Sequence, residues 1–86
     1  MTVQFSKTFV KQLRKAPPKV KRAFRKRLEL FLKDPYHPLL RHHPLTGKLQ
    51  GYRSINITGD WRAIFRFLDR NTVFFNVLGT HSQLYR

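Results

Sequence analysis

Three runs of alternating residues decide the fold of this chain: GYRSINIT (51–58), WRAIFRFL (61–68) and TVFFNVLG (72–79). Side chains along a β-strand point alternately to the two faces of a sheet, so a period of two indicates strands. The short segments between the runs, TGD (58–60) and DRN (69–71), are typical of turns. The stretch predicts consecutive antiparallel strands, and the third, most apolar run is expected inside the sheet.

The first run has one apolar and one polar face. Arg53, Ile55 and Ile57 share one parity. The opposite parity holds Tyr52, Ser54, Asn56 and Thr58. We expect the apolar face to be covered and the polar face to stay open as a binding groove.

The residues before these strands predict a helical hairpin over about 7–33. Phe9, Leu13 and Ala16 recur at the spacing of one helical face, and Ser6 is a suitable N-cap. Proline at 17 and 18 ends the first helix and is tolerated in the first turn of the second. The second helix places its apolar residues on one stripe: Val20, Phe24, Leu28 and Phe31.

The remaining segments complete an α+β domain. TVQF (2–5) alternates and predicts a first strand, whereas 34–47 contains three prolines and is expected to be irregular. The order is β-α-α-β-β-β: an N-terminal strand and a helical hairpin packed on one face of a small curved antiparallel sheet. We expect residues 1–86 to form a single domain, because no linker or repeat interrupts them.

Charge defines the expected partners. The chain carries 18 Lys and Arg against four Asp and Glu, a formal net charge of +14. Such a surface attracts polyanions, with nucleic acid foremost, and an acidic protein partner is compatible with it. There is no cysteine, no apolar run of the roughly 18 residues that a membrane span needs, and no secretory signal pattern. We expect a soluble cytoplasmic protein.

The sequence HHPLTGKLQGYRSINITGDWRAIFRF…GTHSQLYR resembles the RelE/ParE superfamily of bacterial type II toxins, most closely the YafQ-like mRNA interferases. The shared blocks are HPLxGxxxGYR, DW at the next turn and GTHxxL, which together span 43–84. The resemblance implies a RelE-like fold and a ribosome-dependent endoribonuclease that cuts mRNA in the A site without metal or cofactor. It also implies a cognate acidic antitoxin, with the ribosome and mRNA as further partners.

The resemblance assigns groove residues by their place in these blocks. The matching positions are His43, Asp60, Trp61, His81 and Tyr85. Asn56 stands where YafQ-like toxins carry a strand histidine. Arg62 and the Tyr–Arg ending are more similar to RelE itself, so the chain mixes two patterns.

Metal-free RNA cleavage needs a base, an acid and positive charge at the phosphate. Imidazoles suit the first two roles near neutral pH, so His81 and His43 are the candidates. His42 is adjacent to His43 in the same loop, and the sequence does not show which of the two points into the groove. Arg62 is the candidate for stabilising phosphate charge and Tyr85 for stacking or donating a hydroxyl. A strongly positive chain favours an ionised Asp60, which would orient a histidine rather than donate a proton.

Further residues are candidates for RNA binding. Trp61 could stack on a base, Asn56 could bond a base edge, and Arg53 could reach phosphate at the rim. Trp61 and Arg62 have opposite parity, so in a regular strand only one of them lies in the groove. Non-specific phosphate contacts are expected from Lys7, Lys11, Arg22, Arg25, Lys26 and Lys48.

Three other functions stay open from sequence. A ParE-like DNA gyrase inhibitor has the same fold but typically lacks the His, Asp and His set. A small basic module that binds RNA or DNA would not need these residues. A degenerate toxin that binds ribosomes without cutting is compatible with Asn56.

Overall fold

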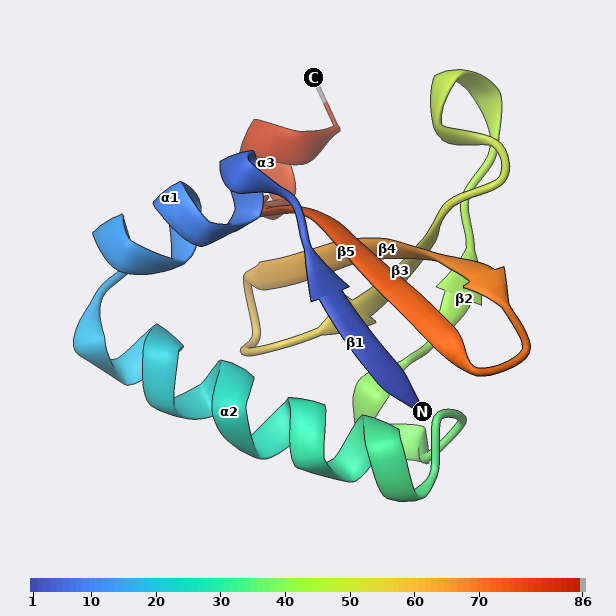
Figure 1. Ribbon diagram of the computed structural model, residues 1–86. Coiled ribbons are helices and arrows are strands. Elements are labelled where there is room, and N and C mark those ends of the chain that lie inside the picture. The colour runs from blue at the N-terminus through green and yellow to red at the C-terminus, as the bar shows by residue number, and fades with distance from the viewer. Residues whose placement is uncertain (86) are drawn as a thin grey trace.

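The computed structural model describes residues 1–85, in which a helical hairpin covers one face of a five-stranded sheet (Figure 1). The strands are β1 (Thr2–Phe5), β2 (His43–Pro44), β3 (Arg53–Asn56), β4 (Trp61–Asp69) and β5 (Thr72–Thr80). The helices are α1 (Lys7–Lys15), α2 (Pro18–Lys33) and the short α3 (His81–Leu84), with 3-10 turns η1 (Pro38–Leu40) and η2 (Gly47–Leu49). The expected α+β architecture is therefore confirmed.

The sheet is mixed, which corrects one expectation. Its strand order is β1-β5-β4-β3-β2, and β1 pairs with β5 in parallel, with Thr2 opposite Thr72. The other neighbouring pairs are antiparallel. The expectation of an antiparallel sheet with the N-terminal strand packed on its face is wrong for β1, which is an edge strand of the sheet and pairs with a strand distant in sequence, where no hairpin fixes the direction. Four short elements were not foreseen: the strand β2, the 3-10 turns η1 and η2, and the helix α3 in the C-terminal segment.

The helical hairpin begins and ends close to the predicted residues. Ser6 accepts a hydrogen bond from the backbone nitrogen of Phe9 at 2.9 Å and so caps α1. Its hydroxyl also donates to the backbone carbonyl of Asn76 at 2.6 Å, which ties the start of α1 to β5. Pro18 is the first residue of α2.

A bulge in β5 keeps its side chains on the correct faces. Ile64 pairs with Val77, but Phe65 pairs with Phe75, so Asn76 is an extra residue in β5. Phe75 and, beyond the bulge, Leu78 are both buried in the core. The Ser6 hydroxyl bonds the carbonyl of this extra residue, so the bulge and the helix cap stabilise one another.

Phe75 is the centre of the core between the helices and the sheet. The rings of Phe5, Phe9, Phe24, Phe31 and Phe65 lie with centroids 5.4–6.0 Å from that of Phe75. Phe75 is completely buried. Aromatic side chains from β1, both helices, β4 and β5 therefore pack together around Phe75.

Within the described residues, no helix is long and apolar enough to cross a membrane.

Phe75→Ala should lower the free energy of unfolding by about 3–5 kcal/mol, because it removes a buried ring that five others contact. Urea denaturation followed by circular dichroism measures the change. Leu68→Ala, at a side chain that is 45% exposed, is the control and should cost less than about 1 kcal/mol. A comparable loss in both variants would show that Phe75 is not the centre of the core.

Candidate active site

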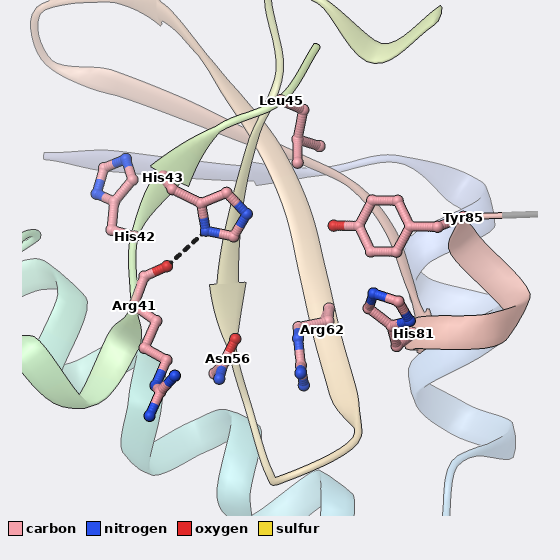
Figure 2. Close-up of a pocket in the computed structure, with 8 residues that line it drawn as sticks. All are labelled: Arg41, His42, His43, Leu45, Asn56, Arg62, His81 and Tyr85. Atoms are coloured by element: carbon pink, nitrogen blue, oxygen red, sulfur yellow. Dashed lines mark hydrogen bonds between the residues drawn. The ribbon is translucent and has the colours of Figure 1, made fainter. Parts of the chain in front are cut away.

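A groove of about 650 Å³ opens on the face of the sheet away from the helical hairpin (Figure 2). One wall comes from β2 and the segments beside it, the other comes from α3, and β3 and β4 form the floor. The groove is lined by Arg41, His42, His43, Leu45, Asn56, Arg62, His81 and Tyr85. Five of the predicted site residues are therefore brought together: His43, Asn56, Arg62, His81 and Tyr85.

His43 is held with one ring nitrogen toward the groove. Its Nδ1 lies 2.7 Å from the backbone carbonyl oxygen of Arg41. That carbonyl belongs to a residue with φ of 47°, in the left-handed region, which ends η1. A carbonyl can only accept, so Nδ1 carries the proton and Nε2 is the nitrogen left free to exchange one. Figure 2 shows the ring extending from β2 into the space before α3.

His42 borders the groove, but its ring points away from it (Figure 2). Its Nδ1 donates to the carbonyl oxygen of Pro35 at 2.8 Å, and its Nε2 lies 3.4 Å from a guanidinium nitrogen of Arg53. The ring stacks on Tyr36 with centroids 4.4 Å apart and meets the edge of Phe65 at 5.2 Å. Burial lowers the pKa of His42, and the charge of Arg53 lowers it further. The two adjacent histidines are thus separated into a structural one and a groove one.

Arg62 is fixed on the floor of the groove. Its terminal nitrogen Nη1 donates to backbone carbonyls of the β3–β4 turn and its edge. The distances are 3.2 Å to Thr58, 3.1 Å to Gly59 and 3.1 Å to Trp61. Asn56 lies opposite Arg62 in the strand register, so the two polar side chains share one row of the sheet.

Trp61 lies on the other face. It packs against the core and lines a separate hollow beside α1 and α3 with Gln12 and Leu84. Neighbouring side chains of β4 point to opposite faces of the sheet, so Arg62 lies in the groove and Trp61 does not. The prediction that Trp61 stacks on a base in the groove is therefore wrong. Arg53 also leaves the groove, since it bonds His42 on the side of Phe65.

The second imidazole comes from α3. Thr80 caps this helix in a capping box with Gln83, and the backbone nitrogen of His81 donates to the backbone carbonyl of Asp60 at 2.9 Å. The ring centroids of His81, at the start of α3, and Tyr85, directly after its end, lie 4.7 Å apart. Asp60 itself is exposed and does not line the groove. It holds His81 through its main chain.

The predicted phosphate-binding cations are spread over the surface. Lys48 lines a smaller hollow with Tyr85 at the α3 side of the groove. Exposed positions on α1 and α2, the layer on the opposite face, hold Lys7, Lys11, Arg22, Arg25 and Lys26.

Residues 1–85 contain no cluster of three His, Asp or Glu able to hold a metal.

Two groove residues were missed in the sequence. Leu45 forms an apolar wall and stands inside the HPL block that carries His43, so the block itself was the signal. Arg41 contributes its carbonyl to His43, and nothing in the sequence marks its left-handed backbone.

A family model matches the chain over residues 1–86: bacterial toxin of type II toxin-antitoxin system, YafQ. The chain belongs to this YafQ family. No match was found among curated protein sequences. The architecture agrees with solved toxin structures, as the following comparisons show.

YafQ from Escherichia coli strain BL21(DE3) superposes with a TM-score of 0.82 at 23% identity, over 98% of this chain and 97% of that one. The toxin-antitoxin complex RelBE2 from Mycobacterium tuberculosis includes a chain with a TM-score of 0.75 and 26% identity, over 93% and 96%. The E. coli DinJ-YafQ complex includes one with a TM-score of 0.70 and 26% identity, over 98% and 96%. The YafQ family assignment and the RelE-like fold predicted from the sequence are both confirmed.

Titration of His42 tests its structural role. Because the folded chain favours the neutral ring, its pKa should lie below the ordinary value of 6.5, as measured by NMR of the ring protons. The unfolded chain then binds more protons just below pH 6.5, so stability should be full above that pH and fall as the pH decreases through the folded pKa. His42→Gln should reduce this fall. A pKa at or above 6.5 would contradict the assignment.

Proposed function

We propose that this YafQ-family toxin is a ribosome-dependent endoribonuclease that cleaves mRNA in the A site without a metal. The observation that carries the proposal is the arrangement of two imidazoles, from β2 and α3, around a groove whose floor holds an arginine. This set can supply a base, an acid and a phosphate-binding cation from three different elements. General acid and base catalysis of this kind contributes roughly 10²–10⁴-fold in rate.

The proton on Nδ1 of His43 makes this histidine the proposed base and leaves His81 as the proposed acid. With Nδ1 of His43 donating to Arg41, Nε2 can take the proton of a ribose 2′-OH. The 2′-oxygen then attacks the adjacent phosphorus, the bond from phosphorus to the 5′-oxygen breaks, and His81 gives its proton to that oxygen. The products are a 2′,3′-cyclic phosphate and a 5′-hydroxyl, and no other reactant is required.

Arg62 and Asn56 act on the charged phosphate. The turn carbonyls hold one terminal nitrogen of Arg62, which leaves its other N–H groups to bond phosphate oxygens as negative charge develops. Asn56 is too weakly acidic and basic to exchange protons near neutral pH, so its carboxamide bonds a phosphate oxygen or a base edge instead. Tyr85, beside His81, offers a ring and a hydroxyl to the substrate.

The ribosome supplies what the groove lacks. The groove is open, and the described side chains include only two histidines placed for proton transfer there. A substrate held by the ribosome would bring the reacting atoms into line, which accounts for a large part of many rate enhancements. The exposed cations of α1, α2 and η2 suit contacts with rRNA phosphates.

An acidic antitoxin is the proposed protein partner. The charge of +14 favours binding to an acidic chain. The DinJ-YafQ and RelBE2 structures are toxin-antitoxin complexes, and each includes a chain whose fold matches nearly all of this one. We expect such a partner to keep the toxin inactive in the cell.

His81→Ala should reduce mRNA cleavage by about 10²–10⁴-fold, because it removes the proposed acid. The assay uses purified ribosomes with a defined mRNA in the A site, and the 5′ ends are mapped. His37→Ala is the matched control, because His37 accepts a hydrogen bond from the backbone of η1 and lies outside the groove. This variant should cleave mRNA as fast as the unaltered chain.

Induction in bacteria separates the alternatives. Codon-phased mRNA cuts that disappear with His81→Ala support the nuclease. Intact mRNA with damaged DNA would instead indicate gyrase inhibition. Arrested translation without cuts would indicate a degenerate toxin that occupies the ribosome.

A further inference from the structure

A second cationic and aromatic cluster lies on the open face of the sheet, outside the groove. The guanidinium carbon of Arg66 is 5.9 Å from the ring centroid of Tyr52 and 5.9 Å from that of Phe74. Arg66 pairs with Phe74 across β4 and β5, and Tyr52 directly precedes the residue paired with Phe65. The three side chains, called the aromatic row below, therefore cross the sheet side by side.

The aromatic row shares its face with the groove floor. Arg66 follows Arg62 by four residues on β4, so both point to the same side, about 13 Å apart along the strand. Between them lie Ser54 and Ile64, which are paired in register and buried. The hydroxyl of Ser54 has no hydrogen-bond partner within the described residues, so this buried strip contains a polar group whose hydrogen-bonding capacity is unmet.

The aromatic row is not needed by the core. The phenylalanines that hold the helices and sheet together point to the other face, and Arg66 is exposed. A cation between two rings at an exposed site contributes only weakly to stability. An arginine flanked by two aromatic side chains on an open sheet is, by contrast, well suited to unpaired RNA, whose bases stack on rings and whose phosphates bond guanidinium groups.

We propose that the aromatic row is a subsite for an unpaired RNA base that flanks the reacting nucleotide. This inference rests on the proposed function and extends its substrate contacts along the sheet. The net charge of +14 and the continuity with Arg62 favour a single RNA strand as the occupant. The strand passes from the groove over the buried strip to Tyr52, Phe74 and Arg66.

Binding of the full chain to a labelled nine-nucleotide RNA tests the subsite. The RNA is 2′-O-methylated so that it cannot be cleaved, and affinity is measured by fluorescence anisotropy. The double variant Tyr52→Leu/Phe74→Leu keeps apolar bulk but loses both ring faces, and should bind about tenfold more weakly. Thermal melting of the variants checks that they fold.

Arg66→Ala is compared with Arg14→Ala, which removes the same charge from an exposed position on α1. Arg66→Ala should weaken binding by more than about threefold and lower the slope of log K against log salt by about one, whereas Arg14→Ala should change neither appreciably. In addition, 4-thiouridine placed along the RNA should crosslink to Tyr52 or Phe74 at a flanking position and not at every position.

Equal affinities for the double variant and the unaltered chain would overturn the subsite, as would no RNA binding by the unaltered chain. An Arg66→Ala effect no larger than that of Arg14→Ala would reduce it to general charge attraction and also overturn it. None of these measurements depends on cleavage. If the double variant binds RNA as tightly as the unaltered chain while the unaltered chain still cleaves mRNA on the ribosome, only the subsite is rejected. If the double variant binds more weakly but the unaltered chain does not cleave mRNA, only the nuclease is rejected.

Discussion

The strict alternation of side chains along β4 is the constraint on which the structure depends. Ala63 and Phe65 point to the helices, and Arg62 and Arg66 point to the open face. A shift of one residue would place guanidinium groups in the aromatic core and phenylalanine in the groove. The cluster around Phe75 prevents such a shift, because its neighbours from four other elements must pack at the same time. Core packing thereby places the cation of the candidate active site.

The same principle governs the edges of the groove. His42 and His43 are adjacent, and the extended backbone directs them to opposite sides. The ring of His42, which points away from the groove, packs among Tyr36, Phe65 and Arg53. This packing holds the short strand β2 against β3. The other ring is consequently presented to the groove with its Nδ1 bonded to a backbone carbonyl. A half-buried histidine thus positions an exposed one.

The groove joins segments that are far apart in sequence. Residues near 43, 56, 62 and 81 contribute, and the contact between the backbones of Asp60 and His81 joins the hairpin turn to α3. The backbone carbonyl of Asp60, the acidic residue beside the lone tryptophan, therefore holds the start of α3 through its hydrogen bond with His81. Its side chain lies exposed outside the groove. The proposed chemistry therefore uses the histidines and Arg62, with Asp60 as a support.

The sequence alone determined most of the helices and strands and which of their residues share a face. Its periods of two and 3.6 predicted β3, β4, β5 and the two long helices, and Ser6 and the prolines predicted where the helices begin and end. The three motif blocks indicated the toxin family, which the family model confirmed. Short-range patterns suffice for these features because each is set by residues within a few positions of one another.

Tertiary structure decided what depends on distant pairing. It set the parallel direction of β1, because only packing against β5 fixes a strand that no hairpin connects. It placed Arg62 and not Trp61 in the groove, and it turned the ring of His43 and not that of His42 into the groove. Alternation in the sequence shows that two neighbouring side chains point to opposite faces, but not which of them faces the core. It also formed the aromatic row, because three strands must be in register before Tyr52, Arg66 and Phe74 become neighbours.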